Sequence, residues 1–446
     1  MTKVKLTEFV NKVFETESNE YSEWFGYYNY DTLNHNQGKM LCNRVSFDGV
    51  IPKKGMSIQL GYYELATAKW IKIGESDSWN WQQGAMAQWL PGVGNENKVI
   101  YNCTRNNHNV ATIYDINTGE EKFIDWAIYG ITPDGRKSIA LEMERSHWCR
   151  AYHYKSVANP EQEGRVIETD GIFEIDLTEN KRRRIISIQD IINTDKRPYF
   201  DEYKHWLEHI MISPSGKRFC FLHRFSPVDN VFKYETRLLI ANIDGSNLQV
   251  ISDWEKYSWS HFGWKGDDEF VIYTQTPYRY SLNGSVGQLL RKQPWNVPAI
   301  AKSLFYGVTS RFPYQLSRLL HGKRHIYQHY VLSDKNCFIL SDNIERSYLD
   351  IDGHPSFTSD GRYMITDSYP DKEQFQRLIV YDTITKKGLI VARLFAHYHR
   401  NPASCDLHPK LSANNDLIVV DTAFDSKHHM ILFQLNWDEI KNKIST

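Results

Sequence analysis

The chain has 446 residues, with 53 Lys and Arg against 54 Asp and Glu. This balance excludes the overall positive field that non-specific nucleic-acid or membrane-surface binding needs, and no apolar run is long enough for a transmembrane helix. Aromatic residues make up 14% of the chain, a density that suits β-structure and sugar-binding surfaces.

The first segment, residues 1–20, is predicted to form a short amphipathic helix. Its sequence, MTKVKLTEFVNKVFETES, has neither the apolar core nor the small-residue cleavage site of a signal peptide. The six cysteines show no CxxC motif and no spacing of a disulfide framework. We therefore expect reduced thiols and a cytoplasmic location.

From residue 21 to residue 440, the sequence repeats a unit of short apolar strands joined by Asp-Gly, Ser-Gly or Asn-rich turns. Clear copies are YGITPDGRKSIALEM, HIMISPSGKRFCFLH, HFGWKGDDEFVIY, HPSFTSDGRYMITD and HPKLSANNDLIVVD, and two weaker copies precede them. Such turns favour tight antiparallel hairpins. Seven units predict an all-β fold, a seven-bladed β-propeller.

Two insertions interrupt the repeat, near residues 146–169 and from about 277 to 347. The second contains helix-like stretches, and the segment from Phe270 to Ser333 carries eight Lys or Arg and no Asp or Glu. This basic, partly helical insertion would clamp an acidic polysaccharide, pair with acidic surface or with a partner chain in a homo-oligomer, or lie on a membrane surface.

When the units are aligned on their turns, one position of the first strand forms a column. The column consists of Asp31, Gln88, Ile128, His209, His261, His354 and His408. The first strand of a propeller blade lines the central channel, so equivalent positions form a ring at one depth. Four imidazoles on one side of this ring could bind a metal or an anionic substrate, or each could only cap its own strand.

Two further residues are expected at the same mouth of the channel. His223 ends the second strand of the His209 unit, and Arg237 begins the next strand. An imidazole base beside a guanidinium is suited to acid–base chemistry on an anion.

Polar residues of other units could add contacts to a substrate. Arg145, His147 and Arg150, in ERSHWCRAYHY, would form a wall near the mouth or simply a self-satisfied loop. Gln88, in a stretch rich in Gln and Trp, is a candidate sugar contact, although core packing explains its tryptophans better.

The motifs RFCFLHRF, TRLLIANIDGSNLQVI, SHFGW and DLHPKLS, within residues 200–435, resemble those of oligogalacturonate lyases and of the wider group of propeller polysaccharide lyases that includes ulvan lyases. The resemblance implies a seven-bladed propeller that cleaves uronate-containing oligosaccharides by β-elimination with a metal. It also implies that His223 removes the proton next to the uronate carboxylate, that Arg237 lies near that carboxylate, and that His261 and His408 bind the metal.

The chain departs from the family pattern at two positions of CDLHPK. Cys405 stands where the family has glutamine, and Lys410 where it has a further histidine. A Cys–His set favours zinc over manganese, or Lys410 supplies the positive charge without a metal.

The column and the resemblance together predict one site. Its metal ligands would be His261, His354, Cys405 and His408, and its substrate contacts would include His209 and Lys410. The expected partner is an acidic oligosaccharide or polysaccharide. The alternative is a propeller without catalytic activity that binds a glycan or acts as a scaffold in polysaccharide metabolism or assembly.

Overall fold

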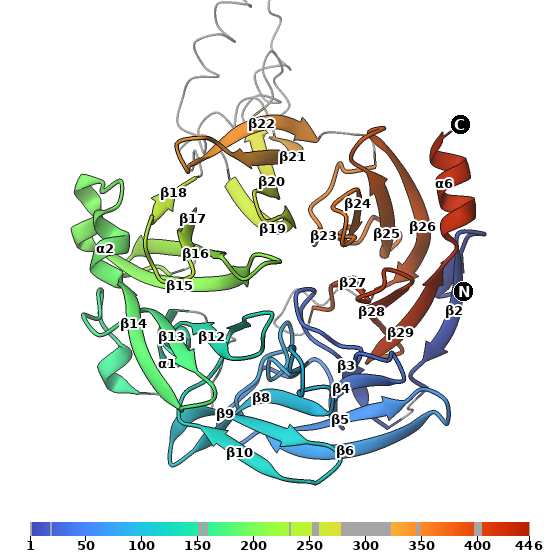
Figure 1. Cartoon of the computed structure of the whole chain (residues 1–446), viewed down its shortest axis with the longest axis horizontal. Coiled ribbons are helices and arrows are strands. Elements are labelled where there is room, and N and C mark those ends of the chain that lie inside the picture. Colours follow the sequence, from blue (N-terminus) through green and yellow to red (C-terminus); the bar gives the residue numbers. More distant parts are fainter. Residues whose placement is uncertain are drawn as a thin grey trace, which may run out of the picture.

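The computed structural model describes residues 2–17, 20–149, 154, 159–231, 233–251, 258–277, 323–344, 348–396 and 404–445. Seven antiparallel sheets surround a central axis (Figure 1). This arrangement confirms the all-β fold and the seven-bladed propeller. Among the described helices, none is long and apolar enough to cross a membrane.

The first four blades each contain four strands that are consecutive in the chain, with the first strand nearest the axis. They are β3 (Ser22–Trp24), β4 (Lys39–Val45), β5 (Ile58–Glu64) and β6 (Lys69–Ser76); β7 (Gln88–Trp89), β8 (Lys98–Arg105), β9 (His108–Asp115) and β10 (Glu121–Ile124); β11 (Gly130–Ile131), β12 (Lys137–Ala140), β13 (Gly171–Asp176) and β14 (Lys181–Ser187); and β15 (Tyr203–Ile212), β16 (Arg218–Pro227), β17 (Glu235–Asn242) and β18 (Gln249–Val250).

The last three blades follow the same order, and two of them gain a strand from the start of the chain. They are β19 (Ser258–Gly266), β20 (Glu269–Pro277), β21 (Lys323–Leu332) and β22 (Phe338–Ile344); β23 (Ser356–Phe357), β24 (Tyr363–Asp367), β25 (Phe375–Asp382), β26 (Lys387–Phe395) and β1 (Val4–Leu6); and β27 (Lys410–Leu411), β28 (Leu417–Phe424), β29 (Lys427–Leu435) and β2 (Val10–Glu15).

The described residues outside the sheets include several short helices. They are α1 (Met143–Cys149), α2 (Ile188–Asn193), α6 (Trp437–Ser445) and the 3-10 turns Pro160–Gln162 and Pro198–Glu202. A capping box formed by Ser187 and Asp190 begins α2.

The predicted N-terminal helix over residues 1–20 is wrong. The segment forms β1, which pairs with β26, and β2, which pairs with β29 and completes the seventh blade (Figure 1). Phe9 and Val10 are buried in the core of the last two blades. The apolar spacing fits a helix in isolation, but pairing with two sheet edges buries part of the apolar side chains and satisfies edge hydrogen bonds. Leu6 and Val13 stay exposed.

A chain that begins at Glu17 is expected to lose far more stability than one that begins at Thr7. The longer truncation removes β2 together with Phe9 and Val10, whose burial contributes about 3–6 kcal/mol in total, whereas the shorter one removes only the fifth strand of a complete sheet. Chemical unfolding of both truncated chains checks this expectation. Equal stability of the two would show that β2 does not close the ring.

The insertions differ in part from their predicted bounds. The first, predicted near 146–169, falls between β12 and β13, where α1 and the turn Pro160–Gln162 are described. The second was predicted over 277–347, but residues 323–344 form β21 and β22 of the fifth blade. Residues 278–322, including most of the predicted basic, helical part, lie outside the described residues.

Candidate metal centre

Three buried side chains converge where the innermost strands of the sixth and seventh blades begin. His354 precedes β23, and Asp406 and His408 precede β27. One ligand atom from each lies within 4.8 Å of the other two. Only 1%, 7% and 2% of these residues, respectively, is exposed, so the cluster lies beneath the surface.

Hydrogen bonds fix the orientation of both histidine rings. The Nδ1–H of His354 donates to Asp367 at 2.9 Å, and the Nδ1–H of His408 donates to the Gly26 carbonyl at 2.6 Å. Each Nε2 atom therefore keeps its lone pair. This is the arrangement in which an outer partner orients a metal-binding imidazole.

One polar atom of each residue in the cluster lacks a partner among the described residues. Within the described chain, His354 Nε2, His408 Nε2 and Asp406 Oδ1 are buried and make no hydrogen bond. A buried polar atom without a partner is costly. A divalent cation would satisfy all three at once, so these residues fit a metal.

Burial also sets the protonation of the cluster. It lowers the pKa of His354 and of His408 well below the usual range, which favours the neutral form that binds metals. Burial, together with the nearby Asp367 carboxylate, raises the pKa of Asp406 to about 7. A bound cation would stabilise the Asp406 carboxylate and so add to metal affinity.

His261, a predicted ligand, lies against this cluster but outside the three-residue group. Its ring centroid is 4.0 Å from that of His354, and its Nδ1 is 3.1 Å from Asp352 Oδ1. Ser260 also donates to Asp352, at 2.5 Å. Burial lowers the pKa of His261, but the Asp352 carboxylate raises it, and the net shift of this pKa is upward. Its side chain is 17% exposed, more than those of the cluster.

The structure does not bring Cys405 into the cluster. Its Sγ lies 3.8 Å from the backbone carbonyl of Asp406, and burial raises the pKa of the thiol well above its usual range. Asp406, which the sequence interpretation missed, takes the place of the predicted thiolate ligand. The sequence does contain a pattern that indicates Asp406, because Asp406 and His408 are two residues apart and share one face of an extended segment.

The predicted pair of His223 and Arg237 does meet, but inside the fourth blade. Arg237 Nε donates to His223 Nδ1 at 2.8 Å, so His223 Nε2–H donates to His205 Nδ1 at 2.9 Å. His205 in turn donates to the Phe200 carbonyl at 2.8 Å. Both ring nitrogens of His223 are thus engaged, which leaves neither free to accept a proton from a substrate.

Elements outside the blade cover this pair. The Arg237 guanidinium donates to the carbonyls of Ile191 and Thr194 at the end of α2 and lies over the Phe200 ring. His223 and Arg237 are each 0% exposed, and burial beside Arg237 lowers the pKa of His223 well below the usual range. The catalytic role that the resemblance implies for the pair stays a prediction, and this burial is evidence against it.

The remaining predicted contacts are dispersed. Arg145 is buried and donates to the carbonyls of His205 and Gln162, and His147 packs edge-on against Trp148. Arg150 lies outside the described residues.

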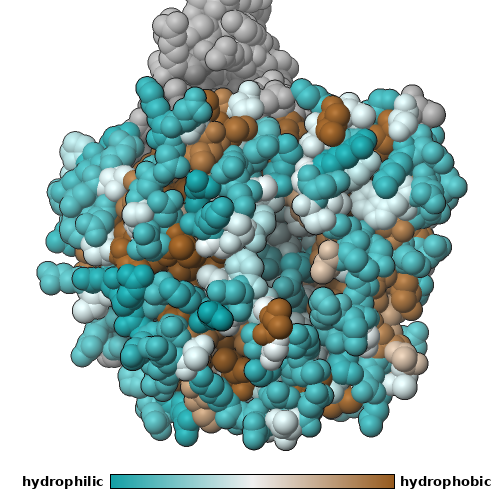
Figure 2. Space-filling model, in the orientation of Figure 1, coloured by the Kyte–Doolittle hydropathy of each residue, from teal (hydrophilic) through white to brown (hydrophobic). Residues whose placement is uncertain are grey.

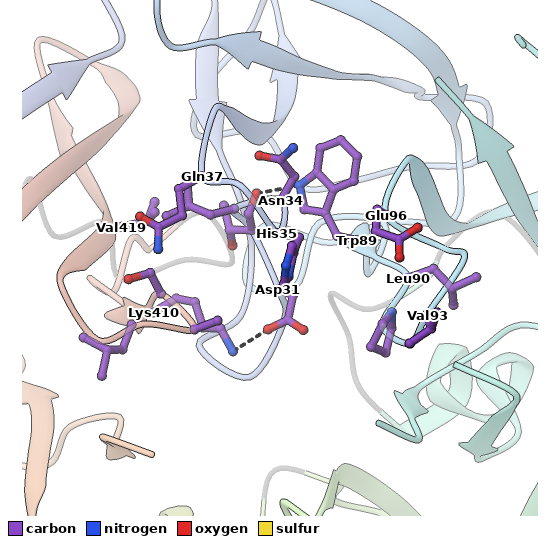
Figure 3. A pocket seen from close by; sticks show the side chains of 17 residues that line it. Asp31, Asn34, His35, Gln37, Trp89, Leu90, Val93, Glu96, Lys410 and Val419 are labelled. Carbon is purple, nitrogen blue, oxygen red and sulfur yellow. Dashed lines mark hydrogen bonds and ion pairs between the residues drawn. The ribbon is translucent and has the colours of Figure 1, made fainter. Parts of the chain in front are cut away.

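Gln88 and Lys410 lie on innermost strands and are not part of the three-residue cluster. Gln88 in β7 is buried. The Lys410 ammonium is 2.9 Å from Asp31 in a separate pocket of about 450 Å³ formed by hairpin turns (Figure 3). Lys410 therefore does not supply the positive charge of the cluster.

His209 is linked to the cluster through an aromatic residue that the sequence interpretation missed. The Tyr27 ring stacks on His209 with centroids 5.3 Å apart and packs edge-on against His408 at 4.8 Å. Tyr28 donates to the Phe262 carbonyl of the fifth blade. The loop from Phe25 to Tyr30 of the first blade thus contacts the fourth, fifth and seventh blades. Figure 2 shows a largely hydrophilic hollow near the middle of one face.

No protein-family model and no curated protein sequence matches the chain. Among solved structures, an oligogalacturonate lyase in complex with manganese matches with a TM-score of 0.60 at 14% identity, over 97% of this chain and 96% of that one. The oligogalacturonate lyase from Vibrio parahaemolyticus matches with a TM-score of 0.57, also at 14% identity, over the same shares. The chain therefore shares the fold of these lyases along its whole length, as the sequence resemblance implies.

Proposed function

We propose that this chain is a metal-dependent lyase that cleaves uronate-containing oligosaccharides by β-elimination. The observation that carries the proposal is the set of three buried ligand atoms without partners, from His354, Asp406 and His408. They lie in a propeller that shares its fold with a manganese-bound oligogalacturonate lyase. The six cysteines, free of disulfides, support a cytoplasmic location.

His354, Asp406 and His408 would hold the divalent cation. Imidazole suits zinc, and a carboxylate suits the harder manganese better than the predicted thiolate would. When bound, the cation supplies Lewis-acid neutralisation of the uronate carboxylate, which makes the adjacent proton more acidic.

Among the predicted histidines, His261 is the one placed to accept that proton. Asp352 holds its Nδ1–H, so Nε2 is left as the acceptor, and the ring lies beside the cluster and is partly exposed. The orienting carboxylate behind an imidazole base is the arrangement that general-base catalysis uses. His223 lacks such an accessible nitrogen.

His261→Gln is expected to reduce turnover of a cleaved oligosaccharide by about 10²–10⁴-fold, the usual effect of removing a general base, while metal content stays at the wild-type level. Formation of the unsaturated product, followed by ultraviolet absorbance, measures turnover, and elemental analysis measures the metal. His35→Gln is the control, because His35 lies in the separate pocket with Lys410. Loss of metal from His261→Gln would make His261 a ligand, and unchanged turnover would remove it from the chemistry.

A second candidate function is a glycan-binding propeller without catalytic activity. The burial of His223 and Arg237 favours it, because the base and the arginine that the lyase resemblance implies are closed off by α2 and Phe200. This candidate predicts that an acidic oligosaccharide binds at the cluster and is recovered uncleaved.

A further inference from the structure

His408 is oriented by a chain of hydrogen bonds that starts in the middle of the seventh blade. The Asp421 carboxylate, in β28, accepts the backbone N–H groups of Phe25 at 3.1 Å and of Gly26 at 3.3 Å. The Gly26 carbonyl then accepts the Nδ1–H of His408 at 2.6 Å. The Asp421 backbone N–H also donates to the Leu407 carbonyl at 2.9 Å, so Asp421 holds the segment that carries His408 from two sides.

The Gly26 peptide is fixed by its surroundings. Gly26 has φ +123°, and a Cβ there would lie 2.8 Å from the Gln83 carbonyl oxygen, so only glycine fits. Asn43 Nδ2 donates to the carbonyls of Trp24 and Phe25, at 3.0 and 2.9 Å. The carbonyl that receives His408 is therefore held in one direction.

The two histidines of the cluster are supported differently. His354 donates directly to Asp367, a carboxylate of the sixth blade that also accepts the backbone N–H of His354 at 2.7 Å. The His408 backbone N–H also donates to Asp367, at 3.2 Å, but the His408 imidazole relies on a loop of the first blade, which Asp421 of the seventh blade ties down. Asp421 is 2% exposed, and its two acceptor bonds to the loop are its described side-chain contacts.

We propose that Asp421 is a positioning residue for the metal, acting through the Gly26 peptide to hold His408 with its Nε2 lone pair facing Asp406 and His354. The proposal rests on the proposed metal site and names residues of this chain that prepare it before any cation binds. It also means that the site is complete only when the first blade is docked on the seventh, where the ring closes.

Asp421→Asn is the direct test. An asparagine keeps one acceptor oxygen but places an amide N–H₂ group against one of the two backbone N–H groups. Calorimetric titration with Mn²⁺ or Zn²⁺ is expected to show an affinity about 10–100-fold weaker than wild type, the usual effect of losing an outer-shell partner. Affinity within twofold of wild type would overturn the positioning role and leave the metal site standing. No binding by the wild type would overturn the proposed function, and the positioning role with it.

Asp382→Asn is the matched control. Asp382 is also a fully buried carboxylate that accepts two backbone N–H groups, from Ile384 at 2.8 Å and Thr385 at 3.3 Å, but it lies at a turn of the sixth blade outside the cluster. Unlike Asp421, it also pairs with Arg362, at 2.9 Å. Its replacement is expected to leave metal affinity unchanged. Equal weakening in both variants would assign the effect to general loosening of the fold and overturn the proposal.

A second measurement determines the tautomer of His408, first in protein that carries no aspartate substitution. In metal-free wild type labelled with ¹⁵N-histidine, His408 is expected as the Nδ1–H tautomer, with its signal assigned by its absence from His408→Gln. An Nε2–H tautomer in the wild type would overturn the proposal. In folded Asp421→Asn, a mixture of the two tautomers is expected.

Discussion

Replacement of His354 and His408 together by glutamine is expected to abolish stoichiometric binding of Mn²⁺ or Zn²⁺. The change removes two of the three ligand atoms that the buried cluster offers. A ligand that binds only the folded state stabilises it by about 2.7 kcal/mol when present at about 100 times its Kd. The wild type should therefore unfold at a higher temperature with added metal, and the double variant should not. Elemental analysis after dialysis and thermal unfolding with and without metal check both effects.

His428→Gln is the control for this experiment. His428 resembles His354 in that its Nδ1 lies 3.0 Å from a carboxylate, that of Asp48, and its buried Nε2 has no partner among the described residues. It lies in β29 and is not part of the three-residue cluster. Metal content that is equal in wild type, control and double variant would refute the site.

His223→Ala is expected to destabilise the fold by about 3 kcal/mol without removing activity from the molecules that remain folded. The substitution leaves a cavity in a fully buried site and deprives Arg237 Nε and His205 Nδ1 of their partner. Denaturant unfolding measures the loss, and turnover per folded molecule separates stability from catalysis.

The same variant, His223→Ala, would also reveal a catalytic role for His223. A catalytic role for His223 predicts a loss of turnover of about 10²–10⁴-fold in protein that is still folded. That result, with near wild-type stability, would restore the role that the family resemblance implies and show that the cover over the pair opens. His429→Ala is the comparison for stability alone, since His429 is a buried residue of an outer strand whose Nδ1 bonds to the Thr16 carbonyl.

The sequence predicts the fold well because the relevant signals are local. Turns such as those of PDGR and PSGK fix where hairpins reverse, and alternating apolar residues fix which face is buried. Three residues of the column lie in innermost strands, namely Gln88, His209 and His261. Two more, His354 and His408, lie just before the innermost strands β23 and β27. Part of the column of histidines is thus visible without coordinates.

Long-range contacts explain what the sequence does not predict. The first strands are stable because they pair with β26 and β29, which lie several hundred residues away. The contribution of Gly26 to the orientation of His408 is a backbone contact across the same distance. Neither the strand pairing nor the contact between Gly26 and His408 can be predicted from residue types or their spacing.

Exposure is the other property that strand patterns miss. The register that places His223 opposite Arg237 in β16 and β17 follows from the turn between the strands. Whether the pair faces the channel depends on α2 and Phe200, which come from the connection before the blade and cover it. The predicted contact between His223 and Arg237 is confirmed. Their predicted accessibility at the mouth of the channel is not.

The most direct test of the proposed function is ultraviolet detection of unsaturated uronate when the metal-loaded chain is incubated with a panel of acidic oligosaccharides that includes oligogalacturonates. We expect absorbance to rise with the wild type for at least one uronate-containing substrate, and not to rise with the His354→Gln/His408→Gln variant. No rise with any uronate substrate, while one of them binds at the cluster and is recovered intact, would contradict the lyase and establish the binding propeller in its place.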